Sequence, residues 1–319
     1  MDVVRYDPTK EQTWNGFRTQ SINGTFMFDR SYMDYHSDLT EMFDERFVDH
    51  SLLFYDNSSL VAILPANERN NSLVSHEGLT FGGLLIPKDL KTPKLLRIFE
   101  ALRTYLRDCD LERIDYKCIP HIYHDFPASA DRYALFRNDA ELYRRDISSV
   151  IPVTGEHKFP RRRRRELNKA NDTGLQVERT DKLDAFWEVL QDNLEREHGT
   201  TPVHSVSEME YLKENFPKNI ELFGCFHNGR MLSGALMYES SRTARLQYLA
   251  TTVEGMDLGS NEKIVDFLLN EYYSSDDVSY LDFGISTEDE GRLLNEGLIT
   301  FKESFDAHPT VHDFYRLQA

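Results

Sequence analysis

The sequence lacks any run of apolar residues long enough to cross a bilayer, which takes about 20, and its first residues lack the apolar region of a signal peptide. It also has only three cysteines, at positions 109, 118 and 225. None of them forms a CxxC pair, so neither a disulfide framework nor a structural zinc site is indicated. We therefore expect a cytoplasmic protein with no membrane span and no bound metal.

Basic residues are in deficit, with 37 Lys and Arg against 54 Asp and Glu and a net charge of −17. This balance argues against a DNA-binding protein, because such proteins gain affinity by neutralising phosphates. The exception is Lys158 with the five arginines at 161–165, directly after Pro160. Arg163 and Arg164 are our candidates for contacts with the phosphates of a CoA, a nucleotide-linked sugar or a tRNA end. The alternative is a solvated helix face paired with the protein's own acids.

A weak internal repeat organises the chain of 319 residues, a length that favours two domains. In each half a turn separates two apolar runs, and the second of these turns contains Asn228-Gly229, a strong hairpin signal. A third strand, a helix and a returning strand follow in each half. The predicted strands are 51–55, 60–64, 79–86 and 113–119 in the first half, and 220–226, 231–237, 244–251 and 278–284 in the second.

Each half closes with a short helix that carries Phe followed by a base, Phe136-Arg137 or Phe301-Lys302, and with a final strand. Strands that alternate with a crossover helix predict an α/β fold with mixed sheets. Residues 152–174 read as a connection with a short basic helix. We expect one domain at 1–152 and a second at 153–319.

Five pieces of the second half come in an order typical of a known family: the basic segment, the stretch 197–205, the turn 254–260, the strand 280–284 and the closing 301–305. In this order they resemble the FemAB-like members of the GNAT superfamily of N-acyltransferases. The first half shares the order of elements without the motifs. The resemblance implies two tandem GNAT-like domains, the first degenerate and the second carrying the active site.

The resemblance also implies an acyltransferase that moves an acyl group from acetyl-CoA or another acyl-CoA to an amine. The acceptor would be a small molecule or a polymer precursor, in cell-envelope or surface-polymer synthesis. One alternative is a FemAB-type aminoacyltransferase that uses aminoacyl-tRNA on a peptidoglycan precursor. Another is a GNAT scaffold that binds a ligand without catalysis.

The segment 255–261 is a candidate anion site because it lies between a strand and a helix. Glycine lets a backbone approach a ligand closely, and a helix N-terminus presents unpaired N–H groups. Asp257 would repel phosphate, and a plain capped loop is the alternative reading. The predicted cofactor-binding residues here are Gly255, Leu258, Gly259, Ser260 and Asn261.

Acyl transfer passes through a tetrahedral oxyanion, which needs a preorganised donor. The resemblance implies that role for Lys302, against the alternative of an exposed helix lysine. Phe301 and Phe305 stand where many GNAT enzymes have a tyrosine acid, so Tyr248 could replace it, or could be a core tyrosine. Asp282 could accept a proton from the amine or bind it, or could pair with Arg245.

Two histidines, His198 and His204, flank Pro202. Either could act as a base near neutral pH. The alternative is a loop role, with both side chains packing and hydrogen-bonding around the proline.

Overall fold

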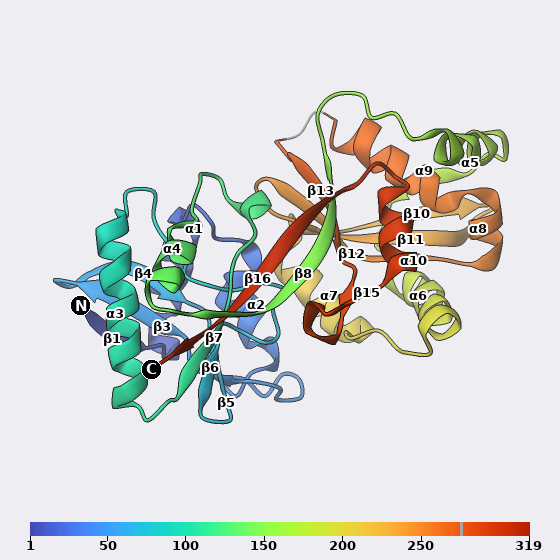
Figure 1. Ribbon diagram of the computed structural model, residues 1–319. Coiled ribbons are helices and arrows are strands. Elements are labelled where there is room, and N and C mark those ends of the chain that lie inside the picture. Colours follow the sequence, from blue (N-terminus) through green and yellow to red (C-terminus); the bar gives the residue numbers. More distant parts are fainter. Residues whose placement is uncertain (275–276) are drawn as a thin grey trace. The chain divides into compact units, whose positions relative to one another are not determined.

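The computed structural model describes residues 1–274 and 277–319 (Figure 1). Internal contacts divide the chain into two compact units. Unit 1 comprises Met1–Ile147, Thr287–Leu293 and Val311–Ala319, and unit 2 comprises Ser148–Ser286 and Leu294–Thr310. That residues 1–152 and 153–319 form two independently folding domains remains a prediction. In the described part of the chain, no helix combines the length and apolarity needed to cross a bilayer.

Unit 1 contains two sheets. The smaller has the order β1-β3-β4, and the larger has the order β2-β5-β6-β7-β16-β8. The strands are β1 (Asp2–Arg5), β2 (Val48–Asp49), β3 (Leu52–Asp56), β4 (Ser59–Leu64), β5 (Asn67–Arg69), β6 (Ser72–Val74), β7 (Arg113–Lys117), β8 (Glu141–Pro152) and β16 (His308–Gln318). The two-residue strands β14 (Thr287–Glu288) and β15 (Leu293–Leu294) pair with each other.

The helices of unit 1 are α1 (Glu11–Gln20), α2 (Arg30–Met33), α3 (Thr92–Asp108) and α4 (Ala130–Arg137). Proline in the first turn of α3 suits a position whose N–H needs no helical partner. The buried residues of α3 recur at helical spacing and form one apolar face: Leu95, Ile98, Phe99, Leu102 and Leu106. This face packs into the hydrophobic core of unit 1.

The third strand predicted at residues 79–86 is wrong. Strands β5 and β6 precede this segment, which itself carries only an isolated bridge between Ile63 and Leu85 among the described residues. Gly83 has φ +95°, outside the range of a regular strand. A Cβ at Gly82 would stand 1.9 Å from the carbonyl oxygen of Ser75. The segment therefore folds tightly against its own chain.

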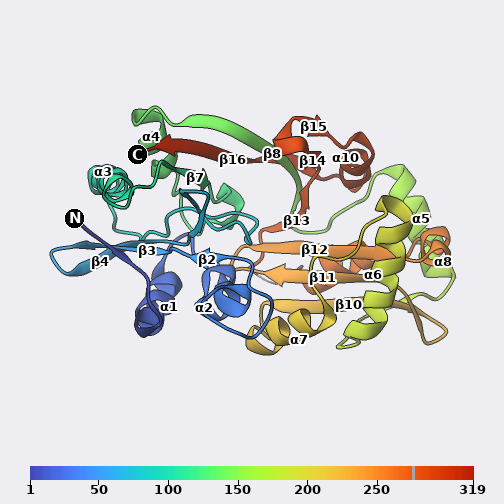
Figure 2. The same ribbon diagram turned by 90° about the horizontal axis from the view of Figure 1, so that it is seen from below.

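Unit 2 is built on a sheet with the order β8-β13-β12-β11-β10-β9, in which β10, β11 and β12 lie side by side (Figure 2). Its other strands are β9 (Gln176–Arg179), β10 (Ile220–His227), β11 (Arg230–Glu239), β12 (Thr243–Thr251) and β13 (Tyr280–Ile285). Its helices are α5 (Arg161–Asp172), α6 (Leu183–His198), α7 (Val206–Asn215), α8 (Val253–Leu258), α9 (Ser260–Phe267) and α10 (Glu296–Glu303). A π-helical turn, Leu268–Tyr272, continues α9.

Helices cover both faces of this sheet, as two successive residues of β11 show. A Cβ at Gly234 would stand 2.3 Å from the ring of Phe186, so α6 packs closely on that face. The next residue, Ala235, belongs to the core cluster that contains Ile264 and Val265 of α9. Since successive strand residues point to opposite faces, α6 and α9 lie on opposite sides of the sheet.

Candidate active site

The parallel strands β12 and β13 separate partway along their length. They pair from Thr243–Tyr280 to Arg245–Asp282, although β12 continues to Thr251 and β13 to Ile285. On its other edge β12 skips a residue in the register with β11, which places a bulge at Gln247. A bulge bends a strand and increases its local twist. The two strands are thus free to diverge beyond Arg245 and Asp282.

A cavity of about 590 Å³ lies where the strands diverge. We call it the unit 2 cavity. Its lining comes from β12 beyond the divergence, from Phe283 of β13, from α6, and from α8, α9, α10 and the residue before α10. The lining residues are Leu190, Asn193, Leu194, Glu197, Leu246, Gln247, Tyr248, Leu249, Thr251, Met256, Asn261, Phe283, Asn295, Gly297, Leu298, Phe301 and Lys302. The lining therefore mixes nine apolar residues or glycine with eight polar or charged residues, among them Glu197 and Lys302.

Lys302 lines this cavity and is only 5% exposed. Its Nζ donates to the carbonyl oxygens of Gly284 and Ile285, each at 2.7 Å. An ammonium has three N–H donors, so one remains without a partner among the described residues. Burial lowers the pKa of Lys302 to about 8; the carboxylate of Asp282 opposes this shift and Arg245 adds to it. At neutral pH Lys302 is thus mostly charged, and one of its N–H groups is available to a ligand in the cavity.

Asp282 is fully buried and does not line the cavity. Its Oδ1 accepts hydrogen bonds from the Ser148 hydroxyl at 2.6 Å and from the Gly284 backbone N–H at 2.8 Å. Arg245 stands beside it in the parallel register, with Nε and Nη1 buried and without a hydrogen-bond partner in the described part of the chain. Asp282 therefore holds the end of β13 in place and supplies negative charge near Lys302.

Tyr248 also lines the cavity, and its hydroxyl lies 2.8 Å from Nδ1 of His204. The Tyr248 ring lies edge-on to Trp187 of α6, with ring centroids 5.9 Å apart. Burial raises the pKa of the Tyr248 phenol. Lys302 and Tyr248 are thus two of the predicted catalytic residues that the structure brings to one cavity.

The segment predicted as a glycine-rich turn contains helix α8. The Gly255 N–H donates to the Thr252 hydroxyl at 3.0 Å, which caps the helix. Glu254 lies in the first turn of α8 and pairs with Arg230 at 3.3 Å. A carboxylate at this end of a short helix disfavours a second anion there.

The other predicted cofactor-binding residues of this segment have mainly internal contacts. A Cβ at Gly259 would stand 2.6 Å from the carbonyl oxygen of Glu166, and the Ser260 hydroxyl lies 3.0 Å from that of Thr251. Leu258 packs against the core of unit 2. Of the five, Asn261 lines the cavity, and its Oδ1 is buried without a partner among the described residues.

The two arginines proposed for phosphate contacts have different environments on α5. Arg163 pairs with Glu262, donates from Nε to the Ser304 hydroxyl at 2.8 Å and stacks 4.1 Å above the Phe305 ring. Arg164 is exposed, as are Arg161, Arg162 and Arg165. Arg163 thus holds α5 against α9 and the end of α10, while Arg164 remains accessible to a ligand.

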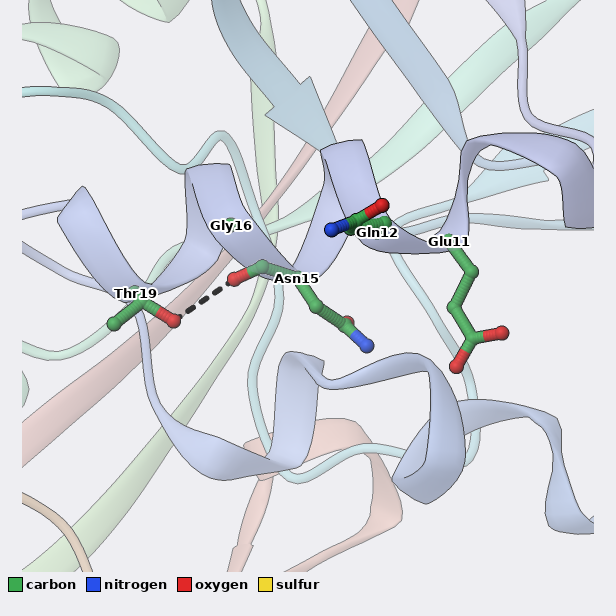
Figure 3. A pocket seen from close by; sticks show the side chains of 5 residues that line it. All are labelled: Glu11, Gln12, Asn15, Gly16 and Thr19. Atoms are coloured by element: carbon green, nitrogen blue, oxygen red, sulfur yellow. Dashed lines mark hydrogen bonds between the residues drawn. The ribbon is translucent and has the colours of Figure 1, made fainter.

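The hollow along α1 offers less chemistry than the unit 2 cavity. It has a volume of about 480 Å³ and is lined by Glu11, Gln12, Asn15, Gly16 and Thr19, whose side chains do not converge (Figure 3). Glu11 is its only ionisable residue. Within the described residues, no group of three His, Cys, Asp or Glu side chains could hold a metal ion.

Sequence reasoning missed the contribution of α6 to the unit 2 cavity. Leu190, Asn193, Leu194 and Glu197 all line it, and their spacing of i, i+3, i+4 and i+7 puts them on one helix face. This periodicity was available as a signal. The periodicity predicts a buried helix face but not what that face covers, because the partner strand β12 lies more than 40 residues further along the chain.

No family model matches the sequence, and no curated protein matches it. Solved structures do match. FemX matches with a TM-score of 0.68 at 13% identity, covering 98% of this chain and 97% of FemX. L-PGS from Bacillus licheniformis matches with a TM-score of 0.61 at 10% identity, covering 97% of this chain and 91% of that one.

A tandem GNAT protein from the clavulanic acid biosynthesis pathway matches with a TM-score of 0.51 at 11% identity, covering 99% of this chain and 98% of that one. The chain therefore has the tandem GNAT fold of FemAB-like proteins. The predicted fold class, α/β with two tandem GNAT-like domains and mixed sheets, is confirmed.

Proposed function

We propose that the chain is an N-acyltransferase whose active site is the unit 2 cavity. The observation that supports this most is the third N–H of Lys302, which no described residue uses, at a cavity formed by diverging parallel strands. The amine attacks the donor's carbonyl carbon, and the carbonyl oxygen takes up negative charge as the C–N bond forms. A fixed ammonium donor stabilises that charge as it develops. The C–S or C–O bond to the leaving group then breaks, and the leaving group takes the proton that the amine loses.

The donor that we propose is an acyl-CoA, such as acetyl-CoA, and the acceptor is an amine on a small molecule or a polymer precursor. Apolar lining residues such as Leu246, Phe283 and Leu298 suit an extended arm, and Asn261 Oδ1 could accept an amide N–H from it. We place this reaction in the cytoplasm, in cell-envelope or surface-polymer synthesis. Asp282 acts in it by holding β13 and tuning the charge of Lys302.

Aminoacyl-tRNA is a second candidate donor, used on a peptidoglycan precursor. The exposed arginines of α5 favour it, since they form a dense basic patch on a chain with net charge −17. Glu254 at the start of α8 also weakens the expected phosphate site there.

The experiment offers acetyl-CoA, longer acyl-CoAs and aminoacyl-tRNA to the purified protein with amine acceptors and detects the product by mass spectrometry. Replacing the four exposed arginines of α5 by Gln should weaken the binding of tRNA, because the variant lacks four charges that can pair with phosphates. A protein that binds a donor but transfers nothing, with any acceptor, would be a scaffold without catalysis. That result would overturn the proposal.

A further inference from the structure

We propose that His204 is a positioning residue that takes up, through the Tyr248 hydroxyl, the proton lost by the attacking amine. This inference depends on the proposed N-acyltransferase activity. It assigns a role to a histidine for which the sequence left a loop role as the alternative. It also gives a route for the proton, which must leave the amine before the acyl product can form.

The geometry supplies a continuous path from the cavity to His204. Tyr248 lines the cavity that contains Lys302, and its hydroxyl lies within hydrogen-bond distance of His204 Nδ1, at 2.8 Å. His204 is half-buried, so a proton on its ring can exchange with water. The bulge at Gln247 interrupts the alternation of side chains along β12 directly before Tyr248, and so changes the face of the sheet on which Tyr248 lies.

The chain around His204 is held in place from both sides. Trp187 Nε1 on α6 donates to the His204 backbone carbonyl at 3.2 Å. Ser205 and Glu208 form a capping box at the start of α7, in which the Ser205 N–H donates to Glu208 Oε2 at 2.7 Å and the Glu208 N–H donates to Ser205 Oγ at 3.2 Å. The imidazole therefore meets Tyr248 in a fixed position, which proton transfer requires.

The proton balance closes without another reactant. As the amine nitrogen attacks, its N–H proton passes to the Tyr248 oxygen, and the phenolic proton passes to His204 Nδ1. His204 becomes an imidazolium, and Tyr248 is again a neutral phenol. The reverse transfers deliver the proton to the departing sulfur or oxygen when its bond to the acyl carbon breaks, which restores neutral His204.

The surroundings of the pair oppose a permanent charge on Tyr248. Burial is the largest cause that raises the Tyr248 pKa, and hydrogen bonds from the backbone of His204 and Val203 and from the Gln247 side chain oppose it. The groups around the pair include the neutral Trp187 of α6 and Gln247 of β12, and Glu208 of α7, whose negative charge further raises the Tyr248 pKa. Glu197 and Lys302 line the same cavity as Tyr248. Tyr248 thus passes a proton on and does not store charge.

The test compares kcat/KM from pH 5.5 to 9 for the wild type, His204→Gln, Tyr248→Phe and the double variant, with the donor that the wild type uses. Wild-type activity should fall towards acidic pH, because a histidine that is already protonated cannot take up the proton. Each single variant should lose about 100-fold and lack this acidic limb, a typical loss for general acid–base catalysis. The double variant should lose no more than either single one, because both residues act in one path. His308→Gln, at an exposed histidine on β16, should keep the wild-type profile.

The possible failures are distinct. A wild-type protein without turnover on any donor would overturn the proposed function and the proton path together. An active wild type with an unchanged acidic limb in His204→Gln, or with losses that multiply in the double variant, would overturn the proton path alone. If His204→Gln does not fold, as judged by circular dichroism, the profile of Tyr248→Phe decides, because loss of one hydroxyl leaves the loop sequence intact.

Discussion

In both units a parallel strand pair runs for only a few residues: β6 with β7 in unit 1, from Ser72–Arg113 to Val74–Asp115, and β12 with β13 in unit 2. Beyond the paired residues of β6 and β7, the chain that follows β6 stays hydrogen-bonded to β7. The Ser75 N–H donates to the Asp115 carbonyl at 2.9 Å, and the Lys117 N–H donates to the Ser75 hydroxyl at 2.6 Å. In unit 2 the corresponding space is the cavity.

A lysine stands at each place, half-buried at Lys117 and buried at Lys302, and the two differ in how many N–H donors they use. Lys117 Nζ donates to the carbonyl oxygens of His76, Glu77 and Leu79, at 2.7, 3.3 and 2.8 Å. All three N–H groups are then occupied, whereas Lys302 uses two of its three. Burial lowers the pKa of Lys117 to about 7. The comparison indicates that the count of occupied donors separates a structural ammonium from one available to a substrate.

The largest effect expected is from Lys302→Met, which keeps much of the side-chain volume and removes the charge. We expect kcat to fall by about 100- to 1000-fold, the usual cost of losing an oxyanion donor. The carbonyls of Gly284 and Ile285 also lose their partner, so thermal melting must show that the variant remains folded. Lys263→Met, which removes an ammonium bound to Asn171 on the surface, serves as the control. A folded Lys302→Met with wild-type turnover would contradict the active site.

Lys117→Met should have the opposite signature, a loss of stability without a loss of chemistry. Three carbonyls would lose this donor, although that of His76 still accepts from the Leu79 N–H at 3.2 Å. Each buried polar group left unsatisfied costs about 1–3 kcal/mol. We expect a lower midpoint of urea unfolding and an unchanged kcat for the protein that remains folded. A fall in kcat without any change in the midpoint would show that unit 1 takes part in catalysis.

The sequence was informative about the fold where the signal was local. Asn228-Gly229 placed the hairpin of β10 and β11, and Pro93 with the apolar spacing after it placed α3. It failed at residues 79–86, where an apolar run with high strand propensity folds as an irregular segment. The irregular path is stabilised by Lys117 of β7, more than 30 positions further along the chain. Its Nζ donates to the carbonyl oxygens of His76 and Leu79.

The candidate site was predictable only in part for the same reason. Phe301-Lys302 could be picked out by its position in the repeat, but the two carbonyls that orient Lys302 depend on the path of β13 around Gly284, where φ is +75°. The glycine among the six residues of α8 favours a turn in the sequence, whereas the structure has a helix there. The contact of His204 with Tyr248 joins residues 44 positions apart, which no local pattern encodes.

A smaller effect should appear in the pH dependence. Because transfer requires the charged form of Lys302, kcat should fall as pH rises through its pKa of about 8. Arg245 lowers this pKa, so Arg245→Met should raise it and move the falling limb to higher pH. Arg230→Met, at an exposed arginine that pairs with Glu254, should leave the limb where it is. A shift to lower pH in Arg245→Met would contradict the electrostatic role of Arg245.

The smallest effect is expected at the counterpart of Phe301-Lys302 in unit 1. Phe136 is 75% exposed and Arg137 is exposed too, whereas Lys302 is 5% exposed at the cavity. Surface substitutions without special contacts change stability by about 0.5 kcal/mol or less. Arg137→Ala should therefore keep both the unfolding midpoint and the kcat of the wild type. Both variants should be measured side by side. If kcat fell as far in Arg137→Ala as in Lys302→Met, the two Phe-base pairs would share a function, and the assignment of the chemistry to unit 2 alone would be wrong.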